Sequence, residues 1–471
     1  SQVQFVLNGS LNVLRFQVGE EELVEQLKKE KFSEENEVIF YRYSLPLPKK
    51  LKAASGAKKP LKIRIEYEGR IYDAVKPADT LTFVVGDYTT GLIGNEGIFV
   101  AETTRWYVRL DDKPSLYDVQ IAVPPPWIIV GQGDALPPFS RGDLTVYHFT
   151  SEIPFDGYAF VGGNYVVNSL EKNGIRISTY FFETEAPLSE IFLNKVAEYL
   201  ERYSQLLTPY PYKKFDIVEN FFTTGYGFPT FTLLGKEVIR MGERALRPGY
   251  LNHELVHCWF GNYLYAPPEE ENWVEGLTTY IANYLPYEEQ SAEAAKNYRF
   301  GLSQKYSTRV TPEKDYPLRK FAGKTEDFEN DIGYSKSAMV FHLIRRIVGD
   351  DIFFLLLRDF IRKKGGSIVR WEDIISLFSA ETGTSLQPII TPWLDLPGLP
   401  SLRISSAKIG YTLPNTSHLE GEWTLDMEIS LCPPLYVLPV PYRIDYGGEI
   451  EDGEIWLKGD KSSLSLRLKK K

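Results

Sequence analysis

The chain contains little cysteine, histidine or methionine: 2, 5 and 3 residues among 471. Cys258 and Cys432 lie far apart in sequence, so a disulfide framework is excluded as the basis of stability, and a reducing compartment such as the cytoplasm is favoured. No apolar run approaches the ~20 residues that a membrane-spanning helix needs. The first residues do not resemble a signal peptide, although a chain without an initiating Met is compatible with a removed leader.

An excess of basic charge is also missing. The 53 Lys and Arg residues are outnumbered by 63 Asp and Glu residues, which gives a net charge of −10. Nucleic-acid binding depends on a basic surface that releases counterions from phosphates, so no nucleic-acid partner is expected. The Lys-rich stretch 48–62 is interpreted as a solvated loop. The sequence carries no feature that specifies an oligomeric state.

The composition, 43% hydrophobic and 25% charged, is that of a folded globular protein. Its length corresponds to roughly two to four domains. The pattern is β to about residue 185, largely helical with some strands over 186–400, and again short alternating strands over 401–471. We therefore expect a multidomain α+β protein with an N-terminal all-β domain (1–185, a sandwich or saddle), a middle domain rich in helices (186–400) and a small C-terminal β domain (401–471).

Apolar periodicity predicts helices in the middle of the chain, at 188–203, 250–260, 269–285, 334–348, 351–363 and 371–382. The third of these follows a Pro-Pro pair. Its predicted first turn is Glu269 to Glu271, where acidic side chains suit the positive end of the helix dipole, and Pro286 is expected to end it.

The second predicted helix contains the pattern His-Glu-x-x-His, formed by His253, Glu254 and His257. Residues four apart lie one turn apart on the same face of a helix, so both imidazoles can bind a single tetrahedral Zn²⁺. Glu254 is then within reach of a water on that metal. Cys258 points to another face of the helix and is interpreted as a buried structural thiol.

A catalytic zinc site needs a third protein ligand and an open position for water. Glu275 on the next predicted helix is the candidate, with Glu269, Glu270 and Glu271 as poorer ones. The sequence thus predicts one Zn²⁺ per chain. The alternative is a pair of ordinary helix histidines beside a surface carboxylate.

These motifs carry a family resemblance. His253-Glu254-x-x-His257, the following Trp-Phe-Gly-Asn, and Trp-Val-Glu275-Gly resemble the gluzincin metallopeptidases of the aminopeptidase N and leukotriene hydrolase type. The segment 206–216 is similar to the family's entry into its catalytic domain, and 393–400 to its exit. The resemblance implies a thermolysin-like α/β catalytic domain (186–400), with Glu254 as general base, and a C-terminal β-sandwich (401–471). It also implies that Tyr334, in a Tyr-x-Lys pattern, stabilises the oxyanion.

The sequence departs from the family in two places. Only 17 residues separate His257 from Glu275, one fewer than is usual, which a shorter loop around 265–271 would absorb. Where the aminopeptidases carry Gly-x-Met-Glu-Asn, this chain has Gly225-Tyr226-Gly227-Phe228 and then Pro-Thr-Phe. The family's Glu binds the substrate's free amino group, and nothing acidic replaces it.

The predicted function is zinc-dependent peptide-bond hydrolysis of aminopeptidase-like type. Gly225, Tyr226, Gly227 and Phe228 are expected to form an edge segment whose backbone pairs with an extended peptide substrate. Glu96 or Glu102 of the β domain is a weaker candidate for the missing carboxylate. Two alternatives stay open: an endo- or oligopeptidase without a requirement for a free amino terminus, and a non-catalytic scaffold that keeps the fold.

Overall fold

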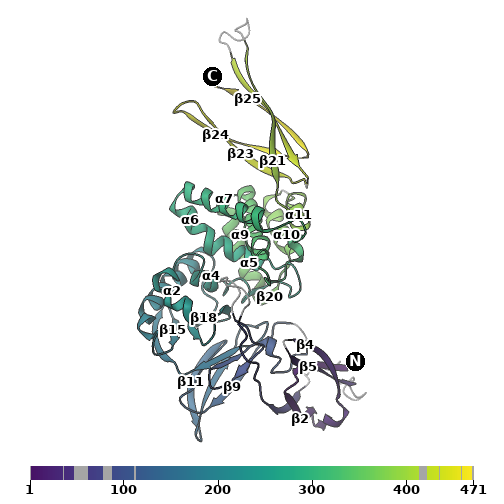
Figure 1. The fold of residues 1–471 in the computed structure, drawn as a ribbon, viewed down its shortest axis with the longest axis vertical. Coiled ribbons are helices and arrows are strands. Elements are labelled where there is room, and N and C mark those ends of the chain that lie inside the picture. Colours follow the sequence, from purple (N-terminus) through teal and green to yellow (C-terminus); the bar gives the residue numbers. More distant parts are fainter. Residues whose placement is uncertain are drawn as a thin grey trace. The chain divides into compact units, whose positions relative to one another are not determined.

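The computed structural model describes residues 2–35, 37–46, 62–77, 87–110, 113–383, 385–412, 422–433, 435–457 and 459–468. Nearly all of the Lys-rich stretch 48–62 lies outside these residues. The chain divides into two compact units, residues 1–265 with 361–367, and residues 266–360 with 368–471. The first unit is mainly β and the second begins with helices and ends in strands (Figure 1).

The N-terminal residues form a β-sandwich of two three-stranded sheets. The strand orders are β1-β5-β4 and β3-β2-β6. Between the sheets, Phe5 of one stacks on Phe16 of the other with ring centroids 5.6 Å apart, and Tyr43 stacks on Phe5 at 5.2 Å. The strands are β1 (Gln2–Asn8), β2 (Leu11–Val18), β3 (Glu21–Glu22), β4 (Lys28–Glu35), β5 (Val38–Pro46) and β6 (Ile63–Gly69).

Two further antiparallel sheets follow in the first unit, with strand orders β10-β13-β8-β7 and β11-β12-β9. Their strands are β7 (Leu92–Ile93), β8 (Ile98–Val100), β9 (Asp118–Val123), β10 (Ile128–Gly131), β11 (Asp134–Arg141), β12 (Leu144–Thr150) and β13 (Phe160–Gly163). Phe99 and Val161 of the four-stranded sheet share a buried core with Val218, Phe231 and Leu233 of the next sheet.

The next sheet contains the segment 225–228, and the helix with the His-Glu-x-x-His motif follows it in the chain. Its five strands have the order β14-β15-β16-β18-β17, in which β15, β16 and β18 are parallel and β17 pairs antiparallel at the end. They are β14 (Val166–Lys172), β15 (Ile175–Phe181), β16 (Lys214–Asn220), β17 (Gly225–Phe228) and β18 (Phe231–Gly235). Helix α2 (Ser189–Leu206) covers the face opposite the shared core, where Phe192 meets Phe181 edge-on at 5.4 Å. Helices α3 (Lys236–Arg240) and α4 (Leu251–Val256) and the short strand β19 (Leu264–Tyr265) follow.

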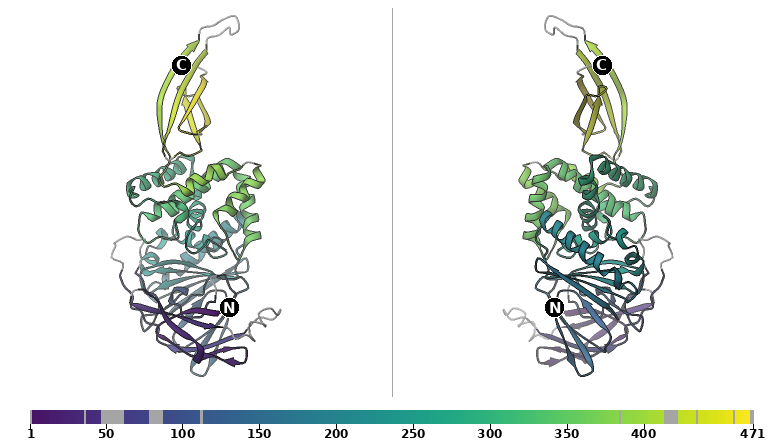
Figure 2. Two further views of the ribbon diagram at one scale, coloured as in Figure 1. Left: turned by 90° about the vertical axis from the view of Figure 1, so that its right-hand side faces the viewer. Right: turned by 90° about the vertical axis from the view of Figure 1, so that its left-hand side faces the viewer.

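The second unit contains a cluster of helices, which the two views of Figure 2 show gathered together in green. Two of its segments, Thr279–Tyr284 and Asp331–Lys336, are π-helical, a rare geometry that is frequent at functional sites. The helices are α5 (Val274–Thr278), α6 (Leu285–Gln290), α7 (Ala292–Arg309), α8 (Ser337–Val348), α9 (Asp350–Lys364), α10 (Trp371–Thr382) and α11 (Gln387–Asp395), and the short strand β20 (Ser367–Ile368) lies between α9 and α10.

The C-terminal strands of this unit form a three-stranded sheet of order β21-β22-β25 and the hairpin β23-β24. Their junction with the helices includes Tyr436, whose ring lies 4.9 Å from that of Trp393 and whose hydroxyl donates to the carbonyl of Gly398 at 3.0 Å. The strands are β21 (Ser401–Thr412), β22 (Glu422–Cys432), β23 (Leu438–Asp445), β24 (Ile450–Leu457) and β25 (Lys461–Leu468). The multidomain α+β fold class is therefore confirmed.

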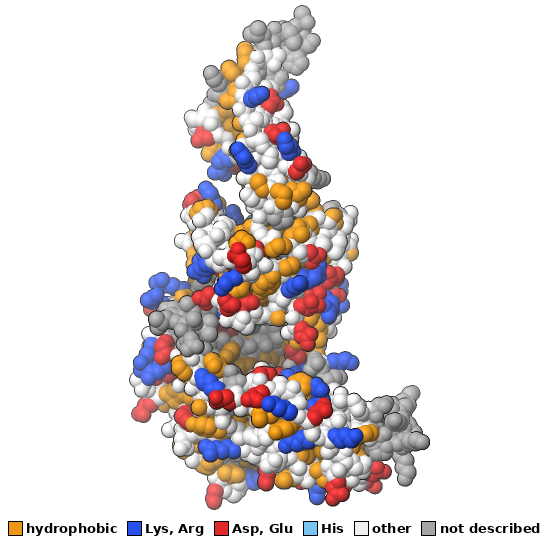
Figure 3. Space-filling view, turned by 45° about the vertical axis from the view of Figure 1, so that its right-hand side comes forward, with side chains coloured by type: hydrophobic (Ala, Val, Ile, Leu, Met, Phe, Trp, Pro, Cys, Tyr) orange, Lys and Arg blue, Asp and Glu red, His pale blue; other side chains and the backbone are white. Residues whose placement is uncertain are grey.

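Surface charges are mixed. On the face shown in Figure 3, acidic and basic side chains are interspersed without a broad area of one sign among the residues drawn in colour. Within the part of the chain that the structure describes, no helix combines the length and apolar character needed to cross a bilayer.

Two predicted helices differ from the observed ones. The regular helix expected over 250–260 covers only Leu251–Val256 and continues as tight turns. The helix expected from Glu269 begins five residues later, at Val274, and Pro286 does not end it. Pro286 instead occupies the first turn of α6, which follows directly on the π-helical segment Thr279–Tyr284.

Gly276 and Gly301 form a matched pair of helix glycines. A Cβ at Gly276 would lie 1.9 Å from Ser337 Oγ, because α5 packs directly on α8, whereas a Cβ at Gly301 in α7 would meet nothing within 4 Å. We predict that Gly276→Ala lowers stability by about 1–3 kcal/mol through overpacking. Gly301→Ala should raise it by about 0.4–1 kcal/mol by restricting the unfolded chain.

Thermal unfolding of the two variants beside the parent chain checks this prediction. A Gly276→Ala variant that unfolds at or above the parent's temperature would contradict the tight contact between α5 and α8.

Candidate metal centre and active site

The two motif histidines lie on one side of a short helical segment. His253 belongs to α4 and is 8% exposed, and His257 is the residue that follows the last regular turn. The backbone N–H of His257 donates to the carbonyl of His253 at 3.2 Å, so the helical path extends to His257 although the regular helix stops. The two ring centroids are 4.8 Å apart. The spacing of four residues therefore places both imidazoles on the same side of the segment, as the sequence predicts.

The His257 ring is oriented by its other nitrogen. His257 Nδ1 lies 3.0 Å from the carbonyl oxygen of Phe260. A carbonyl only accepts, so Nδ1 carries the proton and Nε2 keeps the lone pair that a metal needs. The turn after α4, with Gly261 at φ +104°, brings this carbonyl back toward the ring.

Helix α4 is anchored by Asn252, the residue just before the motif. Its side-chain amide donates to the hydroxyl of Tyr203 on α2 at 3.0 Å, and its oxygen accepts the N–H of Gly249 at 2.9 Å. Asn252 is fully buried. The motif itself predicts no role for this residue, although a polar side chain inside an apolar helix pattern is the kind of signal that points to such an anchor.

Glu275 completes the donor set. It is half-buried on α5, and ligand atoms of His253, His257 and Glu275 all lie within 4.8 Å of one another. Among the residues that the structure describes, this is the one group of three or more His, Cys, Asp or Glu side chains with that property. Two imidazoles and one carboxylate are the donors of a catalytic zinc site with an open position. The residues present therefore fit one Zn²⁺.

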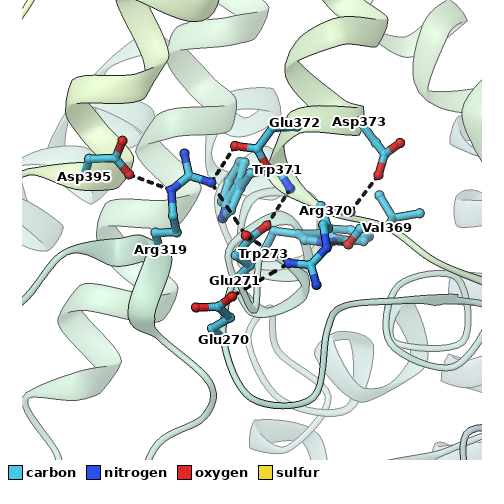
Figure 4. A network of polar contacts seen from close by, with 10 residues as sticks. All are labelled: Glu270, Glu271, Trp273, Arg319, Val369, Arg370, Trp371, Glu372, Asp373 and Asp395. Atoms are coloured by element: carbon cyan, nitrogen blue, oxygen red, sulfur yellow. Dashed lines mark hydrogen bonds and ion pairs between the residues drawn. The ribbon is translucent and has the colours of Figure 1, made fainter. Parts of the chain in front are cut away.

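Glu271 is not a ligand, because other partners occupy its carboxylate. Figure 4 shows it at the centre of a polar network that fixes the segment before α5. Its oxygens accept the N–H of Trp371 at 3.2 Å and a guanidinium N–H of Arg370 at 3.2 Å, and the Arg319 guanidinium lies at 3.7 Å. Arg319 in turn donates to Asp395 at 2.6 Å.

The same segment is held by Trp273, whose indole N–H donates to the carbonyl of Val369 at 2.8 Å. Glu271 itself has a left-handed backbone, with φ +57°, which is incompatible with the first helical turn predicted there. The loop thus turns sharply at Glu271, and α5 begins three residues later. The anchoring role of Glu271 was not predicted from the sequence.

Strand β17 approaches the motif helix very closely. A Cβ at Gly227 would lie 2.9 Å from Glu254 Oε2 and 3.4 Å from His257 Cβ. Glycine therefore leaves room for the Glu254 carboxylate beside the strand. The side chain of Asn262 reaches back from the end of the motif to the carbonyl of Gly227, at 3.4 Å.

The neighbours of Gly227 face the other way, because side chains alternate along a strand. The Tyr226 ring lies 6.0 Å from Phe99, and the Phe228 ring stacks on Phe231 at 4.7 Å. Both therefore pack on the side of the shared core, and the side facing Glu254 presents the backbone of Gly225 and Gly227. As expected, β17 is the edge strand of its sheet.

Tyr334 lies in the π-helical segment before α8 and is half-buried, with its ring 6.1 Å from that of Phe321. Ser337, three residues after Tyr334, packs against Gly276 of α5. The segment that carries Tyr334 therefore lies beside the helix that carries Glu275. Lys336 of the same pattern is buried and donates to the carbonyl of Leu396 at 2.7 Å. Burial lowers the Lys336 pKa to about 8.

The weaker candidates for an amine-binding carboxylate have partners elsewhere. Glu102 pairs with Arg105 at 2.6 Å and lies 3.4 Å from Arg109, and Glu96 accepts the hydroxyl of Tyr72 at 2.7 Å.

Cys258 is fully buried, and burial raises its thiol pKa to about 12, so it is inert, as interpreted from the sequence.

The fold and the donor set are similar to those of zinc metallopeptidases. Residues 192–393 match the model of the Peptidase family M1 domain, which confirms the resemblance that the motifs indicate. A probable M1 family aminopeptidase 2 of Encephalitozoon cuniculi is 21% identical over 410 residues, covering 73% of this chain and 45% of that protein. Aminopeptidase N of Lactococcus lactis is 24% identical over 250 residues, covering 49% of this chain and 29% of that protein.

Solved structures share the fold. Legionella pneumophila aminopeptidase A, in complex with aspartic acid, superposes with a TM-score of 0.68 at 15% identity, covering 98% of this chain and 53% of that one. The M1 zinc metallopeptidase of Deinococcus radiodurans gives a TM-score of 0.61 at 16% identity, covering 85% of this chain and 87% of that one. The alignments with the two curated relatives above span less than half of those proteins.

Replacing Glu271 tests whether its network positions the third ligand. Glu271→Gln removes the charge that faces two guanidinium groups, so the segment before α5 loosens and Glu275 is less well placed. We predict that zinc affinity falls by up to about tenfold. Glu270→Gln, one residue earlier on a 52% exposed side chain, is the matched control and should leave affinity unchanged.

Competition with a chromophoric chelator measures the affinity of each variant for zinc. Equal affinities for the Glu271→Gln and Glu270→Gln variants would show that the network does not position Glu275.

Proposed function

We propose that this chain is a zinc-dependent peptidase that hydrolyses peptide bonds with aminopeptidase-like machinery. The observation that carries the proposal is the convergence of His253, His257 and Glu275 within 4.8 Å, with Glu254 on the same helical segment as the two histidines. The match of residues 192–393 to the M1 peptidase domain supports it. One Zn²⁺ per chain is the cofactor and a peptide is the substrate.

A Zn²⁺ held by these three side chains supplies a Lewis acid that polarises the scissile carbonyl and lowers the pKa of water. Glu254 is half-buried beside the backbone of β17. Its carboxylate takes the proton of the attacking water and later delivers it to the leaving amine. Tyr334 donates its hydroxyl proton in a hydrogen bond to the oxyanion that develops from the carbonyl.

The substrate binds along β17 as an additional strand. An edge strand offers backbone N–H and C=O groups to an extended peptide, and Gly225 and Gly227 keep side chains out of the space beside Glu254. Tyr226 and Phe228 contribute their backbone to this pairing. Their aromatic rings hold the strand from its other side.

A second candidate function is endo- or oligopeptidase action without a requirement for a free amino terminus. It is favoured by the lack of any acidic residue in the sequence 225–231 and by the partners that Glu96 and Glu102 already have. Against it, the two curated relatives described above are aminopeptidases. A non-catalytic scaffold is disfavoured, because His253, Glu254, His257 and Glu275 are all present.

The cytoplasm is the proposed location. Cys258 and Cys432 are both free thiols in the structure, which suits a reducing compartment.

Glu254→Gln separates metal binding from catalysis. The amide keeps the size of the side chain but cannot accept the water's proton, so we predict a full complement of zinc and a loss of about 10²–10⁴ in kcat. Zinc content by atomic emission and peptide turnover are measured on the same preparation. Turnover close to that of the parent chain would rule out the general-base role.

A pair of substrates decides between the two peptidase functions. One good peptide is offered with a free and with an acetylated amino terminus. Since no carboxylate from 225–231 is available to bind the amine, we predict that kcat/KM of the two forms differs by less than about tenfold, or 1.4 kcal/mol. Cleavage of the free form alone would establish a strict aminopeptidase.

A further inference from the structure

The second unit contains a cavity of about 340 Å³ that none of the metal-site residues line. It is an open cavity, lined by α7, α8 with the π-helical segment before it, the end of α11 with the residues that follow it, and strand β23. Its surface is mainly apolar and includes Leu302, Met339, Leu343, Trp393, Leu438 and Pro439. Small-molecule sites typically have volumes of about 300–1,000 Å³ and apolar walls with a few placed polar groups.

The charged groups of this cavity all have one sign. Arg299, Lys336 and Arg346 line it, and among the described residues of the lining there is no carboxylate. Arg299 donates to the hydroxyl of Tyr284, and Arg346 forms an ion pair with Glu454. A guanidinium has five N–H donors, so each of these arginines can bind an anion and keep the contact it already has.

His342 also lines the cavity, and the pKa of its imidazole reflects the charges around it. Burial, together with the positive charges of Arg299, Arg345 and Arg346 and against the opposing effect of Glu288, lowers its pKa to about 4. Its imidazole is therefore neutral at pH 7, with Nδ1 located 3.2 Å from the hydroxyl of Tyr280. Burial disfavours a charge of either sign, whereas the charges of the nearby arginines oppose a cation and attract an anion.

We propose that this cavity is a binding site for a small amphipathic anion, with a medium-chain carboxylate as the simplest example. The alkyl chain lies against Leu302, Met339 and Trp393, and the carboxylate lies beside Arg299 and Arg346. The site is separate from the metal centre and does not depend on peptidase activity. It faces both the helices and the C-terminal strands, so its ligand joins these two parts of the second unit.

Calorimetric titration of the whole, zinc-loaded chain with decanoate tests the proposal. We expect one binding site per chain. Decanol and decyltrimethylammonium have the same alkyl chain but no negative charge, and each should bind at least about tenfold more weakly. Equal affinity for the cationic probe, or no heat of binding with decanoate up to millimolar concentration, would overturn the proposal.

Four variants locate the binding site. Ser303→Trp fills the cavity from α7 without removing a core side chain and should abolish decanoate binding. Arg299→Gln should weaken it about tenfold, whereas Lys296→Gln, on an exposed part of the same helix, should not. Undiminished binding to the Ser303→Trp variant would place the ligand elsewhere, provided near-ultraviolet circular dichroism shows that its fold is unchanged. Met339→Trp, which fills the cavity from α8, gives the same test if Ser303→Trp misfolds.

A carboxylate can also bind zinc, so a His253→Ala variant tests whether decanoate binds at the metal instead of in the cavity. Decanoate binding should survive this substitution while peptide hydrolysis is lost. Loss of binding in the His253→Ala variant would assign the ligand to the metal and overturn the proposed cavity site without touching the peptidase proposal.

Discussion

The placement of Glu275 is the constraint on which the proposed metal site depends, because the two histidines of that site lie on a different segment of the chain. Helix α5 continues into the π-helical segment Thr279–Tyr284 and α6, and Glu275 lies in its first turn, so the contacts at the start of α5 decide where this carboxylate lies. The start of the helix is fixed on both sides. Glu271 binds the N–H of Trp371 and two guanidinium groups just before the helix, and Gly276 lets the helix rest directly on Ser337. Buried polar contacts, and the absence of a side chain at Gly276, thus allow a ligand atom of Glu275 to lie within 4.8 Å of those of the two histidines.

A second consequence of close packing is the bare surface of β17. Gly227 comes so near the motif helix that a Cβ would touch the carboxylate of Glu254. In the proposed function, this strand contributes backbone at the position where the Gly-x-Met-Glu-Asn pattern has a glutamate. The rings of Tyr226 and Phe228 lie on the other side of the strand, against Phe99 and Phe231. The sequence of β17 thus lacks the carboxylate that this pattern would offer to a free amine, so the close packing of the strand bears on the choice of substrate.

Much of this could be predicted from the sequence. The β, helical, β order, the histidine pair and Glu275 follow from periodicity, spacing and the coordination needs of zinc. The position of α5 could not be predicted, because Glu269 to Glu271 have the composition of a helix start. The deciding contacts come from Arg319 and Arg370, which are distant in sequence. The role of Gly276 depends in the same way on the approach of Ser337. Local patterns identify ligands, whereas long-range contacts determine how they are held.

A metal held by His253, His257 and Glu275 would make this chain a peptidase, and one experiment tests that link from metal to activity. Mass spectrometry maps the bonds cut in a mixed peptide library by untreated, chelated and zinc-restored protein. We predict peptide-bond cleavage that disappears with the chelator and returns with zinc. Cleavage that persists after complete removal of the metal, or no cleavage by protein shown to contain stoichiometric zinc, would contradict the assignment.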